Sequence, residues 1–310
     1  MANTKSKKTS SKKPSTKPKA AEKSAKTVKT EAAATKKVAT TAKVAPAVVT
    51  TKKQNPFKGF FARKCDPNEN ILTIFKGHRI WGAILGELIG TMLLSIVLLT
   101  LGAYQPLYIM FAMVGITMAV YAISGAHVNP AVTVGMMASR RVSAIRGILY
   151  IVAQVIGAWL GLMIVNAFRV AGGEAYDIPE MTAIDVEKLA PIIFVELIGA
   201  AIIGFFFARA QHYRSPKGAF TYAAMIAGGV TIAFIFAIVI TSNYLSMSNV
   251  FMMNPAIAIM YQIFPSAADN FGALMGDIAL AVLTYIIIPM IGSVIGFFLA
   301  DASSALADEA

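Results

Sequence analysis

Ser124-Gly125-Ala126-His127-Val128-Asn129-Pro130-Ala131-Val132-Thr133 and the later triplet Asn254-Pro255-Ala256 decide how this chain is organised. Asn is a favoured N-cap residue and Pro a favoured first helical residue, so each Asn-Pro-Ala triplet predicts the start of a helix. The apolar stretches that begin there, about 130–138 and 255–263, are shorter than the roughly 20 residues that a bilayer span needs. Each triplet therefore predicts a helix that reaches about half of the hydrocarbon depth.

Longer apolar runs surround the two short stretches. The chain has 310 residues, of which 56% are apolar and 14% charged, whereas a soluble domain carries about 25% charged residues. Runs long enough to span lie at roughly 81–100, 106–124, 146–168, 190–208, 220–241 and 277–300. The sequence therefore predicts an all-α membrane protein with six transmembrane helices and two re-entrant half-helices.

The two halves of this region, about 80–168 and 190–300, repeat one another. Gly86-Glu87-Leu88-Ile89-Gly90 in the first span matches Val195-Glu196-Leu197-Ile198-Gly199 in the fourth. Each half has three spans, an odd number, so the second copy is inverted and the solute path is expected between the halves at the midplane. The two half-helix N-termini, with their free N–H groups and positive dipole ends, would meet there.

Basic residues are concentrated at the N-terminus. Residues 1–79 carry 20 of the 28 Lys and Arg residues but 4 of the 16 Asp and Glu residues. We expect a disordered basic tail at 1–66, a juxtamembrane interfacial segment at 67–79 and a short acidic C-terminal tail at 303–310. The basic connections after spans 2 and 4 predict that both termini are cytoplasmic.

The basic tail has three candidate roles. It sets the orientation as a solvated segment, contacts anionic lipids, or binds nucleic acid. Nucleic acid is the least favoured partner, because the sequence contains no folded nucleic-acid reader.

Residues 124–133 resemble the first signature of the aquaporin and glycerol-facilitator family, the major intrinsic proteins. The features of residues 80–300 are similar to that family as well. The resemblance implies an aquaporin-like channel domain at 80–302, a homotetramer with one pore per subunit, and passive flow of water or small neutral solutes such as glycerol. It also implies a multi-pass protein of the plasma membrane. The sequence offers no nucleophile–base pair, phosphate loop or metal cluster, so neither enzyme activity nor a cofactor is expected.

The resemblance assigns roles to individual residues. Six would line the pore at the midplane: Asn129, Pro130, Ala131, Asn254, Pro255 and Ala256. Buried acids in spans are costly and normally functional, and the resemblance implies that Glu87 and Glu196 brace the re-entrant loops. His127 is expected to brace its loop or to lie in the cytoplasmic vestibule.

The chain departs from the family pattern at the constriction. The family's Arg directly after the second Asn-Pro-Ala is Ile257 here, and the glycerol facilitators' Asp is Ala258. The other constriction candidates are Phe251, Ile109 or Phe111 from the second span, and Thr241 or Ser242 from the fifth. Apolar walls leave the hydrogen bonds of water unmet, so these residues favour glycerol-like solutes over strict water selectivity.

Four other functions are alternatives. A strict water channel fits the same fold. A coupled transporter is disfavoured because spans 2, 3, 5 and 6 lack acidic residues well inside, and an ion channel because no charged residues are placed to line a pore. A lipid- or nucleic-acid-tethering protein with a vestigial pore is the fourth.

Overall fold

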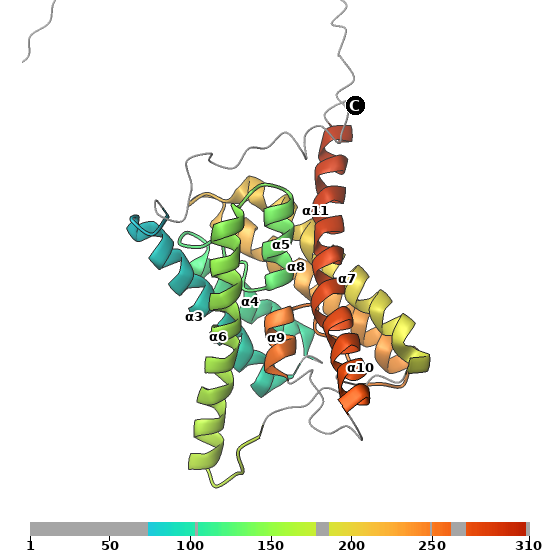
Figure 1. The fold of residues 1–310 in the computed structure, drawn as a ribbon. Coiled ribbons are helices and arrows are strands. Elements are labelled where there is room, and N and C mark those ends of the chain that lie inside the picture. The colour runs from blue at the N-terminus through green and yellow to red at the C-terminus, as the bar shows by residue number, and fades with distance from the viewer. Residues whose placement is uncertain (1–73, 103–104, 178–185, 249, 262–270, 308–310) are drawn as a thin grey trace, which may run out of the picture. The chain divides into compact units, whose positions relative to one another are not determined.

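The computed structural model describes residues 74–102, 105–177, 186–248, 250–261 and 271–307. Within these residues the secondary structure is helical (Figure 1). The predicted basic tail at 1–66 and most of the interfacial segment at 67–79 lie outside them. His78 and Arg79, predicted to belong to that segment, form the first turn of α3 instead.

All six predicted spans are present as helices. They are α3 (His78–Leu101), α4 (Pro106–Val120), α6 (Ala144–Ala171), α7 (Leu189–Ala210), α8 (Ala219–Ile238), which continues as η3 (Val239–Tyr244), and α10 (Phe271–Val282), which η4 (Leu283–Ile287) joins to α11 (Ile288–Ala307). Five of them are long and apolar enough to cross a membrane, and α4 is shorter, at 15 residues. The last helix runs to Ala307, into the predicted C-terminal tail.

The two half-helices begin where the triplets predict. They are α5 (Pro130–Ala138) and α9 (Pro255–Met260). The side-chain oxygen of Asn129 accepts a hydrogen bond from the Ala131 N–H at 2.8 Å, and that of Asn254 accepts one from the Ala256 N–H at 3.1 Å. Both asparagines are therefore true N-caps, and the proline after each occupies the first helical position.

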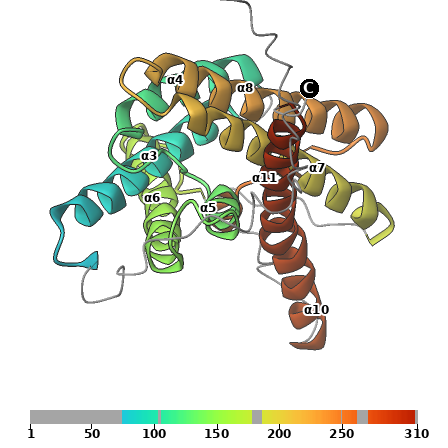
Figure 2. The same ribbon diagram turned by 90° about the horizontal axis from the view of Figure 1, so that it is seen from above.

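In each half, glycines bring the first and the third span into close contact. On α6, a Cβ added to Gly161 would lie 2.5 Å from the Ser95 Oγ of α3. On α11, Gly292 and Gly296 lie directly against carbonyl oxygens of α7. In both views α6 runs beside α3 and α11 beside α7 (Figures 1 and 2). The small residues permit the close approach, as is typical of helix pairs in membranes. The α3–α6 pair of the first half thus corresponds to the α7–α11 pair of the second half.

Candidate functional site

The two capping asparagines are hydrogen-bonded across the interface between the half-helices. Asn129 Nδ2 donates to the carbonyl oxygen of Met253, and Asn254 Nδ2 donates to that of Val128, each at 2.9 Å. An amide NH₂ group has two N–H donors, so each asparagine keeps one for another partner. The structure therefore brings the triplets together as the inverted repeat predicts, with the N-terminal ends of α5 and α9 at one point.

The residue before each asparagine has an unfavourable backbone conformation. Val128 has φ of 42° and Met253 has φ of 52°, which is rare for residues other than glycine and a marked outlier for a β-branched one. Their side chains pack onto matching glycines of the outer helices, Val128 onto Gly90 and Met253 onto Gly199. The strained conformations recur at matching places, where their carbonyl oxygens accept the bonds from the opposite asparagine.

The buried glutamates hold the loops that lead into the half-helices. Glu87 Oε1 accepts the His127 N–H at 3.0 Å, and Glu87 Oε2 accepts the Val128 N–H at 2.7 Å. Glu196 accepts the N–H groups of Met252 and Met253 in the same way. Both carboxylates are fully buried. Each acid thus satisfies two N–H groups of irregular backbone, a need that is strict at membrane depth.

Two further polar residues, to which the sequence analysis gave no role, extend the hydrogen bonds around Glu87. Gln154 on α6 donates from Nε2 to Glu87 Oε2 at 2.7 Å and to Thr133 Oγ1 at 2.9 Å. Thr133 Oγ1 in turn lies 3.2 Å from His127 Nδ1. The signal that could have found Gln154 is its position as a polar residue inside an apolar span, where such residues are normally functional.

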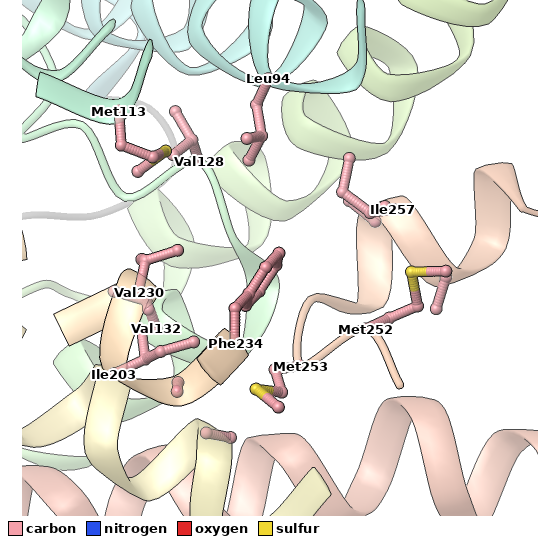
Figure 3. Packing of buried hydrophobic residues seen from close by; sticks show 14 of the residues in the cluster. Leu94, Met113, Val128, Val132, Ile203, Val230, Phe234, Met252, Met253 and Ile257 are labelled. Carbon is pink, nitrogen blue, oxygen red and sulfur yellow. The ribbon is translucent and has the colours of Figure 1, made fainter. Parts of the chain in front are cut away.

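A cavity of about 30 Å³ lies at the asparagines. About 10–15 Å³ is enough for one water molecule. His127, Asn129 and Asn254 are its polar lining. The rest of the wall is apolar, mostly labelled in Figure 3, and comes from Leu94, Leu98, Met113, Val128, Val132, Ile203, Phe207, Val230, Phe234 and Met252. The cavity is thus an apolar chamber with a small polar face.

The predicted constriction residues do not line this cavity. Ile257, Phe251, Ile109 and Thr241 are buried, with exposed fractions of 0–1%, and are not among the residues that line it. The ring of Phe251 packs against the ring of Phe234, 5.8 Å between centroids, and Phe234 faces the cavity. Phe234 and Met252 are thus part of the apolar wall in place of the predicted residues, and no sequence signal separates them from other apolar residues.

Two of the alternative candidates point outward. Phe111 is 64% exposed, and Ser242 is also exposed. Phe111 comes two residues after Ile109 on a helix, which turns its side chain about 200° to the opposite face. The interior position is therefore that of Ile109, and Thr241 rather than Ser242 faces inward.

Comparison with known proteins points to one family. A family model described as "Major intrinsic protein" matches residues 73–301. Aquaporin-4 of Bos taurus is 36% identical over 135 residues, which is 36% of this chain and 41% of that protein. The probable aquaporin PIP2-1 of Oryza sativa subsp. japonica is 57% identical over 49 residues, 16% of this chain and 17% of that protein. The chain thus matches less than half the length of either relative.

The fold is similar to a solved structure, the X-ray structure of the aquaglyceroporin from Plasmodium falciparum. The TM-score is 0.53 at 17% identity, over 74% of this chain and 100% of that one. At this identity the likeness shows the arrangement of helices alone.

Proposed function

Because the chain belongs to the major intrinsic protein family, we propose that it is a passive membrane channel for small uncharged solutes, with the pore between the N-terminal ends of α5 and α9. One observation carries this proposal. The two asparagines are held by each other's loops, and each keeps a free N–H donor at a cavity. A solute with a lone pair can accept these bonds, whereas a cation meets two positive dipole ends.

The lining of the cavity supports a preference for glycerol-like solutes over water. Ten of its thirteen lining residues are apolar, and each hydrogen bond that a solute cannot make there costs about 1–3 kcal/mol. The carbon face of a polyol matches such a wall better than water does. Since the cavity holds one or two water molecules at about 30 Å³, glycerol also requires wall side chains to move. Met113 and Met252 are unbranched and flexible enough to do so.

We propose further that the protein forms homotetramers in the plasma membrane with both termini in the cytoplasm. The contacts at one end of the bundle support the orientation. Arg141, after α5, forms a bidentate ion pair with Asp301 of α11, with N–O distances of 2.7 and 3.2 Å. Arg209 at the end of α7 bonds to Ser304. The basic connections and the C-terminal helix end therefore share one side, which the positive-inside rule assigns to the cytoplasm.

Stopped-flow light scattering of proteoliposomes tests the function. Impermeant sucrose added outside the vesicles shrinks them at a rate that reports water permeability, and glycerol added outside reports glycerol entry by the re-swelling that follows. We expect glycerol permeability to exceed that of protein-free vesicles by a larger factor than water permeability does. A large gain in water permeability with none for glycerol would establish the strict water channel instead.

A variant of the wall serves as the matched comparison. Phe234→Leu keeps the wall apolar but shortens it, so glycerol permeability should rise. Phe194→Leu, on the exposed face of α7, should change neither permeability.

A further inference from the structure

The start of α3 presents basic and aromatic side chains together on the surface. Lys76, His78 and Arg79 are exposed, and among the residues that the structure describes none of the three has an acidic partner. Phe75 and Trp81 flank them in the sequence and are also exposed. Their rings lie 5.5 Å apart between centroids, and the indole N–H of Trp81 donates to the carbonyl oxygen of Phe75 at 3.4 Å. We call these five residues the α3 patch.

The α3 patch is continuous with the apolar outer face of its helix. Leu85 follows Trp81 by four residues, which places it on the same face of α3, and it is 54% exposed. The patch also shares one end of the bundle with Arg141, because Ile145 at the start of α6 packs against the cluster that contains Ile80. Cations and aromatic rings at the end of an apolar span are typical of the membrane–water interface.

A buried cluster connects the α3 patch with the loop at 124–128, which leads into α5. Ile74 and Ile80, on either side of the exposed cations, are buried in one cluster with Tyr150 of α6. The hydroxyl of Tyr150 donates to the carbonyl oxygen of Ser124 at 3.2 Å. Its ring meets that of His127 edge-on, 5.3 Å between centroids, and His127 lines the cavity. A ligand that holds the start of α3 in place therefore also stabilises the position of Tyr150 against this loop.

We propose, on the basis of the channel function above, that the α3 patch binds the headgroups of anionic phospholipids and that the bound lipid increases solute flux through Tyr150. The cations match the phosphate and net negative charge of such headgroups, and each Lys or Arg beside an anionic leaflet is worth about fivefold in binding. Phe75 and Trp81 lie where aromatic side chains are favoured, between headgroups and acyl chains. A nucleic acid would match the cations, but it has no counterpart for the apolar face that continues from them.

Tryptophan fluorescence tests the binding. The chain has two tryptophans, so Trp159→Phe leaves Trp81 as the reporter in the full-length protein. In mixtures of phosphatidylcholine and phosphatidylglycerol, one of them with brominated chains, quenching of Trp81 reports which lipid is in contact with it. We expect a preference for phosphatidylglycerol of about five- to twenty-fivefold at low salt, since Lys76 and Arg79 each contribute about fivefold, and a smaller one at high salt. Trp159, with Trp81→Phe, should show no preference, because residues 150–168 contain no Lys or Arg.

Charge-removing variants assign the preference to the α3 patch. Lys76→Gln combined with Arg79→Gln should reduce the preference for phosphatidylglycerol to within about twofold of equal binding. Lys12→Gln combined with Lys13→Gln removes the same charge from the N-terminal region of the sequence and should leave the quenching of Trp81 unchanged. The two pairs together separate a local contact from the overall charge of the chain.

Glycerol entry tests the link to the pore. It should be about two- to fivefold faster per inserted protein when the vesicles contain phosphatidylglycerol, since a ligand shifts an equilibrium by no more than its preference for one state. Tyr150→Phe keeps the ring but removes the bond to Ser124. It should abolish this lipid dependence and leave the quenching of Trp81 unchanged. The matched control is Tyr285→Phe, which removes the corresponding bond of the second half, to the carbonyl oxygen of Val250 at 3.2 Å, and should keep the lipid dependence.

The outcomes are distinct. Equal quenching by the two lipids, or a preference that survives the loss of Lys76 and Arg79, overturns the lipid site. Displacement of phosphatidylglycerol from Trp81 by RNA at physiological salt overturns it in favour of a nucleic-acid surface. Equal glycerol flux in the two lipid mixtures, or a lipid dependence that persists in Tyr150→Phe, overturns the link to the pore. Absence of glycerol and water flux in both mixtures, with the quenching preference intact, removes the channel function itself and leaves the lipid site standing.

Discussion

Replacing Ile257 with arginine restores the residue that the family pattern has after the second Asn-Pro-Ala. Ile257 is in the first turn of α9 with an exposed fraction of 0%. It lies close along the chain to Asn254 and Met252, both of which line the cavity. Figure 3 shows it on the short helix next to Met252. The longer guanidinium has no room in the packed layer, so it must reach the cavity to be solvated.

The size of the effect follows from the cavity. Its volume of about 30 Å³ leaves little free space once a guanidinium enters, so a three-carbon polyol is excluded sterically. Water loses space as well, but it gains a partner with several N–H donors. One recovered hydrogen bond in an apolar site is equivalent to about 1–3 kcal/mol. We therefore expect glycerol permeability to fall by about tenfold or more and water permeability to stay within about threefold.

The assay is the pair of sucrose and glycerol gradients in the same proteoliposome preparation. Ile257→Met conserves volume and apolar character and should leave the ratio of the two permeabilities unchanged. A selective loss of water permeability in Ile257→Arg would refute the reasoning. Equal losses in a protein with an unchanged melting temperature would refute it too.

Four other predictions concern the tail and the packing. Deleting residues 2–54 should leave flux per inserted protein unchanged, and a peptide of residues 1–54 should bind anionic vesicles at low salt and leave them at high salt. Gly161→Val should destabilise the protein by about 1–3 kcal/mol in thermal unfolding, because its side chain meets Ser95. Glu196→Gln leaves one backbone N–H unpaired and should lower the melting temperature together with flux, at about 1–3 kcal/mol. Asp301→Asn weakens the pair with Arg141 and should cost about 2 kcal/mol with little loss of flux.

Each of these has a contrary result. Binding of the tail peptide to RNA but not to anionic vesicles at physiological salt would exclude the lipid role. The control for Gly161→Val is Gly228→Ala. A Cβ added at Gly228 meets no atom within 4 Å, so this variant should not destabilise the protein. Glu196→Gln with full flux would mean that the carboxylate does not hold the loop, and Asp301→Asn with full loss of flux would place that ion pair in the solute path.

The fold was predictable because the two Asn-Pro-Ala triplets and the lengths of the apolar runs agree with the internal repeat of the sequence. The Asn-Pro triplets fix the starts of α5 and α9, and the apolar runs fix the spans. Helix ends were predicted less well. The second span ends at Val120 rather than at 124, because residues 121–124 form a turn that leads to Gly125, whose φ is 104°. The third span begins at Ala144, where Ser143 caps it.

The candidate site was only partly predictable. That Asn129 lies against the second triplet follows from the inverted repeat, which places the matching motifs opposite each other. The contact of Glu87 with the loop of its own half follows from the family resemblance. The residues of the cavity wall do not. Phe234 and Ile109 are equally apolar, and only the rotation of each helix in the bundle decides which one faces the cavity.

The central claim is that small neutral solutes pass the paired asparagines passively. The most direct measurement is the initial rate of glycerol entry into proteoliposomes, recorded over a wide range of gradients and at imposed membrane potentials of either sign. A passive pore for uncharged solutes predicts a rate that rises in proportion to the gradient and does not depend on the potential. A rate that saturates, or one that changes with the potential, would contradict it.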